Sequence, residues 1–305
     1  MKAGVEGLVA LLLLSACAPT PIDTHGTRAL ATLSSGECPD LTKSGLSTFT
    51  SSGEPRQVDV VLPSSPKPGM AITVYLHGTA FPTATSTPAA DIAVLHDVQG
   101  IADATNTVWL MPDARVQTLL DTVTVYLWDV MVLDDKDLVL FDDLRTCAAQ
   151  NLDVDLTRLS TVGFSAGALW NTVLIGQRAD AISTGVELSG GSDAVVAGLE
   201  APFAPYTTPP ANLPMLMTTG ADGVDVWPTT AMVMVDFNAA TDTLEGKLLA
   251  DGHFSVRCQD ENGHEEGDRD WAIAVAWTSG QVFAQPSPYV SGGLGADADW
   301  CWVSG

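Results

Sequence analysis

The sequence predicts an α/β fold in which a mostly parallel central sheet is covered by helices on both faces. From residue 56 onward, short apolar runs alternate with stretches of helical spacing, which is the pattern of strand–helix–strand units. The chain has 305 residues, of which 46% are hydrophobic, enough for a large buried core. Polar and small residues follow several of the apolar runs, and ligands bind open α/β sheets at such strand ends.

The predicted strands are apolar runs that end at turn-forming residues. Residues 72–76 are typical of a buried parallel strand and end at His77 and Gly78. Residues 107–111 end in the same way at Pro112. The predicted strands, in chain order, are 58–62, 72–76, 107–111, 159–162, 184–188, 215–218 and 253–256.

The predicted helices have apolar residues three or four positions apart. In residues 138–149 this spacing runs through Leu144, Cys147 and Ala148. The other predicted helices are the stretch after residue 167, residues 244–249 and residues 271–277. Residues 286–305 lack the pattern and are predicted to be a loop-like tail.

The N-terminal segment is predicted to be an export signal. Lys2 is followed by an apolar run over residues 8–14, which is too short to remain as a membrane span. Residues 14–17 read Leu-Ser-Ala-Cys and resemble a bacterial lipobox, which predicts that Cys17 becomes the lipidated first residue of the mature protein. The alternative is ordinary signal cleavage at this point, with Cys17 incidental.

These features divide the chain into three parts. Residues 1–16 are predicted to be a lipoprotein signal peptide, and residues 17–37 the lipidated cysteine and a flexible tether rich in Thr, Ser, Pro and Gly. Residues 38–305 are predicted to be a single catalytic domain. We therefore expect a protein of the bacterial cell envelope that meets the membrane through its lipid anchor only, or a secreted protein if it is not lipidated.

Cysteine content and net charge narrow the possible functions. Cys38, Cys147, Cys258 and Cys301 form an even set in an exported chain and predict two disulfides, whose pairing the sequence leaves open. No C-x-x-C spacing occurs, so neither a zinc site nor a redox site is predicted. The formal charge of −24 repels phosphate, which argues against a nucleic-acid partner.

The most informative motif is the G-x-S-x-G at residues 163–167, which places Ser165 between a predicted strand and a predicted helix. A serine hydroxyl is a poor nucleophile unless the backbone presents it to a base. A sharp strand-to-helix turn does so, and glycines on both sides remove side chains that would clash in that turn. The context therefore predicts a nucleophile elbow.

A base and an orienting acid should follow Ser165 in the order Ser, Asp, His. His253 begins a predicted strand, whereas His264 lies in the loop before the last helix, where α/β-hydrolases place the general base. The acid should lie between, just past a strand. Asp222 is nearest to the preceding predicted strand and is preferred; Asp225 is the alternative acid, and Asp236 is third.

The predicted oxyanion hole consists of two backbone amides. One is the N–H of Ala166, directly after the nucleophile, and the other comes from residues 77–80, which follow an early strand. Thr79 is the preferred donor, with Ala80 as the alternative. His77 is predicted to be structural.

The predicted reaction is acyl transfer through a covalent ester. His264 takes the proton of Ser165, Ser165 attacks a carbonyl carbon, and water hydrolyses the acyl-enzyme. This chemistry requires neither a metal nor an organic cofactor. Trp227 lies on the loop of the candidate acids and is predicted to contact the ester substrate, whether polymeric or small.

The same residues carry a resemblance to a known family. Residues 155–158 and the G-x-S-x-G resemble the "D-x-x-R … G-x-S-x-G" block of polyhydroxybutyrate depolymerase and feruloyl esterase-like α/β-hydrolases. Residues 141–144, 188–191 and 251–254 are similar to that family as well. The resemblance implies an α/β-hydrolase fold and a secreted esterase acting on polyesters or on esters of plant-wall phenolics. It also implies a triad of Ser165, Asp222 and His264.

Three hypotheses follow from the sequence. The favoured one is a lipid-anchored serine esterase that hydrolyses short-chain polyesters or feruloyl and acyl-sugar esters. A second is a non-catalytic surface-binding lipoprotein that has kept the fold. A third is an α/β-hydrolase serine peptidase, although the sequence shows neither a separate specificity domain nor a pocket for a peptide terminus.

Overall fold

The computed structural model describes residues 27–83, 86–119, 123–196, 201–229, 232–295 and 298–304. The predicted signal peptide, Cys17 and the first part of the predicted tether lie outside these residues. Among the residues in these ranges, no helix is long and apolar enough to cross a membrane.

A nine-stranded sheet forms the centre of the fold, in the order β1-β2-β4-β3-β7-β8-β9-β12-β13. The six neighbouring strands from β4 to β12 run parallel, and antiparallel strands lie at both edges. This confirms the predicted mostly parallel sheet. The strands of the sheet are β1 (Gly45–Ser51), β2 (Glu54–Val61), β3 (Met70–Leu76), β4 (Thr107–Pro112), β7 (Val154–Phe164), β8 (Thr184–Leu188), β9 (Met215–Thr219), β12 (Ser255–Gln259) and β13 (Cys301–Val303).

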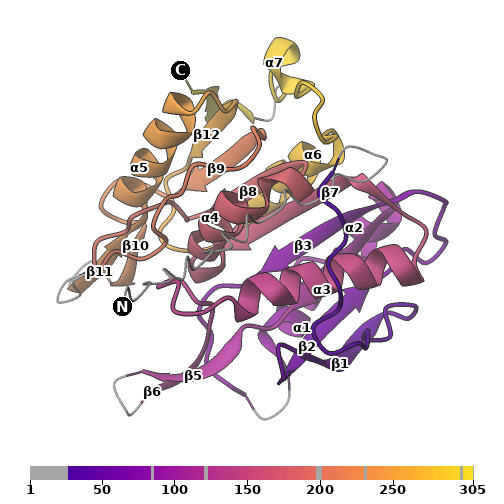
Figure 1. The fold of residues 1–305 in the computed structure, drawn as a ribbon. Helices are drawn as coiled ribbons and strands as arrows, with labels where there is room; N and C mark the ends of the chain where they lie inside the picture. Colours follow the sequence, from indigo (N-terminus) through magenta and orange to yellow (C-terminus); the bar gives the residue numbers. More distant parts are fainter. Residues whose placement is uncertain are drawn as a thin grey trace, which may run out of the picture.

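Helices cover both faces of the sheet, as predicted (Figure 1). One hydrophobic core lies between the sheet and α3, α4 and α5, and a second lies between the sheet and α1, α2 and α6. Along β3, Ile72 and Val74 belong to the first core and Tyr75 to the second, because neighbouring side chains of a strand point to opposite faces. The helices are α1 (Pro88–Leu95), α2 (Val98–Thr105), α3 (Lys136–Asn151), α4 (Ala166–Arg178), α5 (Phe237–Ala250), α6 (Asp268–Ser279) and α7 (Tyr289–Gly292), with a short 3-10 helix, η1 (Ala179–Ala181).

Two hairpins lie outside the main sheet. One pairs β5 (Arg115–Leu119) with β6 (Val123–Leu127), and the other pairs β10 (Val226–Thr229) with β11 (Met232–Asp236). The sequence did not predict these strands. Each hairpin follows a strand of the main sheet along the chain, β4 in the first case and β9 in the second.

The prediction of a flexible tether over residues 17–37 is wrong for residues 27–37. These residues pack along α3, where the Ser34 hydroxyl and backbone N–H both donate to the Asp143 carboxylate. Arg28 also forms an ion pair with Asp180, at 3.1 Å. The segment is therefore fixed to the domain by polar contacts before Cys38 is reached.

The structure contains two disulfides, as predicted, and it resolves their pairing. Cys38 is bonded to Cys147 of α3, and Cys258 of β12 is bonded to Cys301 of β13. The second bond joins two strands that are also hydrogen-bonded to each other. The prediction that residues 286–305 are a loop-like tail is therefore wrong where the chain forms β13.

Candidate active site

Ser165 lies in a sharp turn between β7 and α4. Its backbone has φ 54° and ψ −121°, a region that residues other than glycine rarely adopt. A Cβ atom on Gly167 would lie 1.9 Å from the carbonyl oxygen of Leu76, and one on Gly163 would lie 2.6 Å from the carbonyl oxygen of Gly167. Gly167 is therefore required for close packing of α4 against the end of β3, and Gly163 for close packing of β7 against the first turn of α4. The strained turn presents the Ser165 hydroxyl at the sheet edge.

His264 lies in the loop between β12 and α6, as predicted, and reaches Ser165. Its Nε2 atom is 2.8 Å from the Ser165 Oγ atom. The imidazole is held between two aromatic rings, Phe164 with centroids 5.1 Å away and Phe237 with centroids 4.1 Å away. Stacking on both faces fixes the plane of the imidazole, and with it the directions in which Nδ1 and Nε2 point.

The acid that reaches His264 is Asp225, and the preference for Asp222 is wrong. Asp225 Oδ1 lies 2.8 Å from His264 Nδ1, and the Asp225 side chain is fully buried. Asp222 is exposed and accepts a hydrogen bond from the side chain of Gln259. Asp236 accepts from the Ala239 N–H and caps α5.

A tight turn explains why the nearer aspartate is not the one that reaches the histidine. The N–H groups of Val224 and Asp225 both lie 3.0 Å from the carbonyl oxygen of Ala221. This turn directs Asp222 away from the sheet and returns the chain at Asp225. Distance from the strand along the sequence is therefore a poor measure of distance from His264.

The second carboxylate oxygen of Asp225 is also satisfied. Asp225 Oδ2 accepts from the Ser189 hydroxyl at 2.8 Å and from the Gly220 N–H at 2.9 Å. A buried carboxylate needs such donors, because its charge is not stabilised by water. Ser189 is a member of the site that was not predicted, although its position just past β8 is the same kind of signal that marks the candidate acids.

The predicted oxyanion loop passes directly against Ser165. A Cβ atom on Gly78 would lie 3.1 Å from the Cβ atom of Ser165. The Ala166 N–H belongs to the first turn of α4, where backbone N–H groups have no partner within the helix. Ala80 donates its N–H to the carbonyl of Tyr126, whereas the Thr79 N–H has no hydrogen bond within the part of the chain that the structure describes. Thr79 therefore remains the candidate donor from this loop, in preference to Ala80.

His77 fixes the conformation of the oxyanion loop through hydrogen bonds of its side chain and its backbone carbonyl. Its Nε2 atom accepts the N–H of Ala114 at 3.0 Å, so Nδ1 carries the proton and donates to the carbonyl of Gly78. Burial lowers the pKa of His77 to about 4, which keeps the ring neutral. Trp128 donates to the His77 carbonyl at 2.8 Å. These contacts agree with the prediction that His77 is structural.

The tryptophan proposed as a substrate contact is half-buried on β10. Trp227 packs against the core on the α3–α5 side of the sheet. Trp128 and Trp170, by comparison, are almost fully buried and stack on each other with ring centroids 5.2 Å apart. The partial exposure of Trp227 leaves its predicted contact with substrate open.

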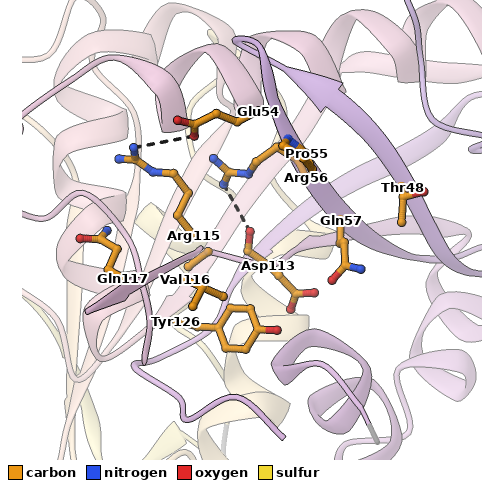
Figure 2. Close-up of a pocket in the computed structure, with 11 residues that line it drawn as sticks. Thr48, Glu54, Pro55, Arg56, Gln57, Asp113, Arg115, Val116, Gln117 and Tyr126 are labelled. Atoms are coloured by element: carbon orange, nitrogen blue, oxygen red, sulfur yellow. Dashed lines mark hydrogen bonds and ion pairs between the residues drawn. The ribbon is translucent and has the colours of Figure 1, made fainter. Parts of the chain in front are cut away.

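A groove of about 580 Å³ lies between the start of β2 and the β5–β6 hairpin, and most of the residues that line it are polar. Figure 2 shows Arg56 directed at the backbone carbonyl of Asp113, which accepts its hydrogen bond at 3.2 Å. Arg56 also pairs with Asp137 at 2.8 Å, and Arg115 pairs with Asp134 at 2.9 Å. The arginines that line the groove are therefore already neutralised by carboxylates.

Two residues that line the groove also contact the predicted oxyanion loop. Tyr126 lines the groove and forms a two-way backbone bridge with Ala80. Ala114 also lines the groove and donates to His77. Among the residues that the structure describes, no group of three or more His, Cys, Asp and Glu side chains is placed to hold a metal ion.

No protein-family model matches the chain, and no curated protein matches it in sequence. Solved structures do match. An alanine variant of pOPH in complex with pNPB is 15% identical, with a TM-score of 0.64 over 88% of this chain and 96% of that one. Native sOPH is 17% identical, with a TM-score of 0.61 over 86% and 94%. FphF, a fluorophosphonate-binding serine hydrolase of Staphylococcus aureus, is 11% identical, with a TM-score of 0.52 over 77% and 97%.

These likenesses establish the class of the fold. The chain has an α/β-hydrolase fold, which it shares with these structures. At these identities the fold is what the comparison shows, and the chemistry has to be argued from the site itself.

Proposed function

We propose that this protein is a serine hydrolase that cleaves carboxylic esters. The observation that carries the proposal is the continuous chain of contacts from Ser165 Oγ to His264 Nε2, and from His264 Nδ1 to Asp225 Oδ1, each 2.8 Å long. A nucleophile, a base and an orienting acid in this geometry define the Ser-His-Asp constellation, which recurs on unrelated folds.

The proposed reaction has two halves. His264 Nε2 accepts the Ser165 proton as Oγ bonds to the ester carbonyl carbon, and buried Asp225 stabilises the imidazolium through Nδ1–H. The amides of Ala166 and Thr79 donate to the oxyanion. His264 then gives its proton to the departing alcohol. Water attacks the acyl-enzyme in the second half, again through His264, and releases the acid and Ser165.

Ser165→Ala tests this proposal, with Ser279→Ala as the matched control, because Ser279 is an exposed serine at the end of α6. We expect Ser165→Ala to lower kcat on p-nitrophenyl acetate and butyrate by at least about 10³-fold. A fluorophosphonate probe should label wild type and Ser279→Ala but not Ser165→Ala. Equal rates for wild type and Ser165→Ala would exclude the esterase proposal and favour the non-catalytic alternative.

For the substrate we propose an extended, uncharged ester. The groove beside the oxyanion loop lies about 10–15 Å from Ser165, judged from the spacing of the strands that separate them. Its arginines are already paired, which favours hydrogen-bonding hydroxyl groups over a charged ligand. Of the ester classes predicted from the sequence, this favours feruloyl and acyl-sugar esters over short-chain polyesters. We expect Gln57→Ala, which alters the groove, to lower kcat/KM for a feruloyl sugar and leave p-nitrophenyl acetate hydrolysis unchanged; loss on both substrates, or on neither, argues against the groove as a subsite.

We further propose that the protein is exported and anchored by a lipid on Cys17. The two disulfides support an extracytoplasmic location, because such bonds persist in oxidising compartments. We expect Cys17→Ala to move the protein from the membrane fraction to the soluble fraction. Unchanged fractionation would exclude lipidation as the anchor.

A further inference from the structure

Glu187 is a buried carboxyl group that the proposed reaction does not use. It lies on β8 with no exposed side-chain surface. Its neighbours in the sheet are Gly163 on β7 and Met217 on β9. An ionised carboxylate at such a position is costly unless a cation pairs with it, and its hydrogen-bond partners are a hydroxyl and a backbone amide.

The hydrogen atoms available around Glu187 indicate which form it takes. Thr172 Oγ1 lies 2.7 Å from Glu187 Oε1 and 2.8 Å from the carbonyl oxygen of Gly191. If Glu187 were ionised, both neighbours would be acceptors, and the single hydroxyl hydrogen of Thr172 could serve only one of them. If Glu187 is protonated at Oε1, it donates to Thr172, Thr172 donates to Gly191, and every contact contains one hydrogen.

The third contact closes a ring. The Gly191 N–H donates to Glu187 Oε2 at 2.8 Å, so Glu187, Thr172 and Gly191 are joined in a cycle of three hydrogen bonds. We infer that Glu187 is a positioning residue, held as the neutral acid in this ring, and that it fixes the loop over residues 188–191 on which the alignment of Asp225 and Ser165 depends. This inference rests on the function proposed above. Independently of the ring geometry, burial raises the pKa of Glu187 to about 8.

The loop over residues 188–191 contacts both ends of the proposed triad. The carbonyl of Leu188 accepts the Ser165 N–H at 3.0 Å, and the Ser189 hydroxyl donates to Asp225 Oδ2 at 2.8 Å. At the other end of the loop, Gly191 is pressed against α5, where an added Cβ would lie 2.2 Å from the backbone carbonyl carbon of Ala240. A shift of Gly191 therefore changes the position of Ser189, and with it the hydrogen bond that orients Asp225.

The groups that face Glu187 from the helices carry no charge. Thr172 comes from α4, and the Thr241 hydroxyl of α5 donates to the carbonyl of Gly190. The nearest cation at the same register position is Arg257, two strands away on β12, and it is paired with Asp242 and Glu245 of α5.

Two further charged groups lie beyond the loop. Lys247 of α5 is paired with Asp193 at 2.7 Å. Asp225 and His264 are connected to the loop over residues 188–191 through the Ser189 hydroxyl, which donates to Asp225. No cation is thus available to stabilise an ionised Glu187 among the groups that the structure places around it.

The test compares Glu187→Gln with Glu187→Leu. Glutamine can repeat the ring, because its amide N–H donates to Thr172 and its oxygen accepts from Gly191. We expect Glu187→Gln to keep kcat on p-nitrophenyl acetate at pH 7. Glu187→Leu should lower kcat by about 10- to 100-fold with little change in KM, as misplacement of a catalytic group does. A folded Glu187→Leu variant with wild-type kcat would overturn the inference.

The pH profile and the infrared spectrum give two further readouts. Wild-type kcat should fall as the pH rises through about 8, where Glu187 ionises, and Glu187→Gln should lack this fall. The infrared difference spectrum of wild type minus Glu187→Gln at pH 7 should contain the C=O stretch of a protonated carboxylic acid. Absence of that band overturns the inference, whether or not the protein hydrolyses esters. Presence of the band without any ester hydrolysis leaves the neutral acid standing and excludes the proposed function.

Discussion

Replacing Asp225 by asparagine gives the sharpest test of the site, because the structure determines how the new amide must be oriented. Asp225 Oδ2 accepts from the Gly220 N–H, which is a backbone group and cannot turn away. In Asp225→Asn the amide oxygen must therefore occupy this side. The amide NH₂ then faces His264 Nδ1.

The consequence is a change of tautomer. Facing an NH₂ donor, His264 Nδ1 has to become the acceptor, so the proton moves to Nε2, the atom that lies 2.8 Å from Ser165 Oγ. His264 can then no longer accept the Ser165 proton. In serine proteases with this constellation, the same change lowers kcat by about 10⁴-fold. At about 1.36 kcal/mol per factor of ten, this corresponds to about 5 kcal/mol of transition-state stabilisation.

Asp222→Asn is the matched control, since Asp222 lies three positions away and is exposed. The new amide oxygen can still accept from the Gln259 side chain, which predicts a change in rate of no more than about two-fold. The assay is kcat and KM for p-nitrophenyl acetate, with circular dichroism to establish that both variants fold. A large loss in Asp222→Asn together with wild-type activity in Asp225→Asn would refute the reasoning.

Three further predictions concern stability. Gly167→Ala should abolish soluble folded protein, because its Cβ would lie 1.9 Å from a backbone oxygen; the yield of soluble protein and its circular dichroism test this, and a folded Gly167→Ala would contradict the packing argument. Gly246→Ala has open space on α5 and should raise the free energy of unfolding, measured in urea, by up to about 1 kcal/mol. Replacing Cys38 and Cys147 together by alanine should lower the free energy of unfolding by about 3–5 kcal/mol, because the bond closes a loop of 109 residues, and equal denaturant midpoints with and without the bond would contradict this. Burial raises the pKa of Glu266 from 4.5 to about 7, so the stability of wild type relative to Glu266→Gln should fall as the pH rises from about 4.5 through about 7, and a flat difference over that range would contradict it.

The sequence predicted the parallel part of the fold well because that part is encoded by local patterns. Each predicted strand overlaps an observed strand of the main sheet, and residues 184–188 match β8 at both ends. These strands are largely buried on both faces, so most of them are apolar runs that end at turn residues; residues 184–188, which include Glu187, are less apolar. The β5–β6 hairpin was missed because its strands include exposed positions such as Val116 and Val123, and because it pairs outside the main sheet.

The prediction of a flexible N-terminal tether was wrong for a different reason. Composition suggested a tether because residues 18–37 are rich in Thr, Ser, Pro and Gly and lack an apolar period. Their order comes from polar partners far away in sequence, such as Asp143 for Ser34 and Asp180 for Arg28. Hydrogen bonds that span more than one hundred residues leave no periodic signal in the segment itself.

The proposed nucleophile and base could be predicted from the sequence, but the choice of the proposed acid depended on a turn. Ser165 is marked by a pattern that the packing of β3 enforces through Gly167, and His264 by its place before the last helix. Asp222 and Asp225 differ only in which way a short turn points them. Two contacts determine this turn. The N–H groups of Val224 and Asp225 both donate to the Ala221 carbonyl, and the buried Asp225 carboxylate needs hydrogen-bond donors. Asp225 finds those donors in Ser189 and Gly220, on loops that follow two different strands. The position of the acid is thus a property of the sheet edge as a whole, which is why it follows from the assembled strand ends and not from the spacing within one loop.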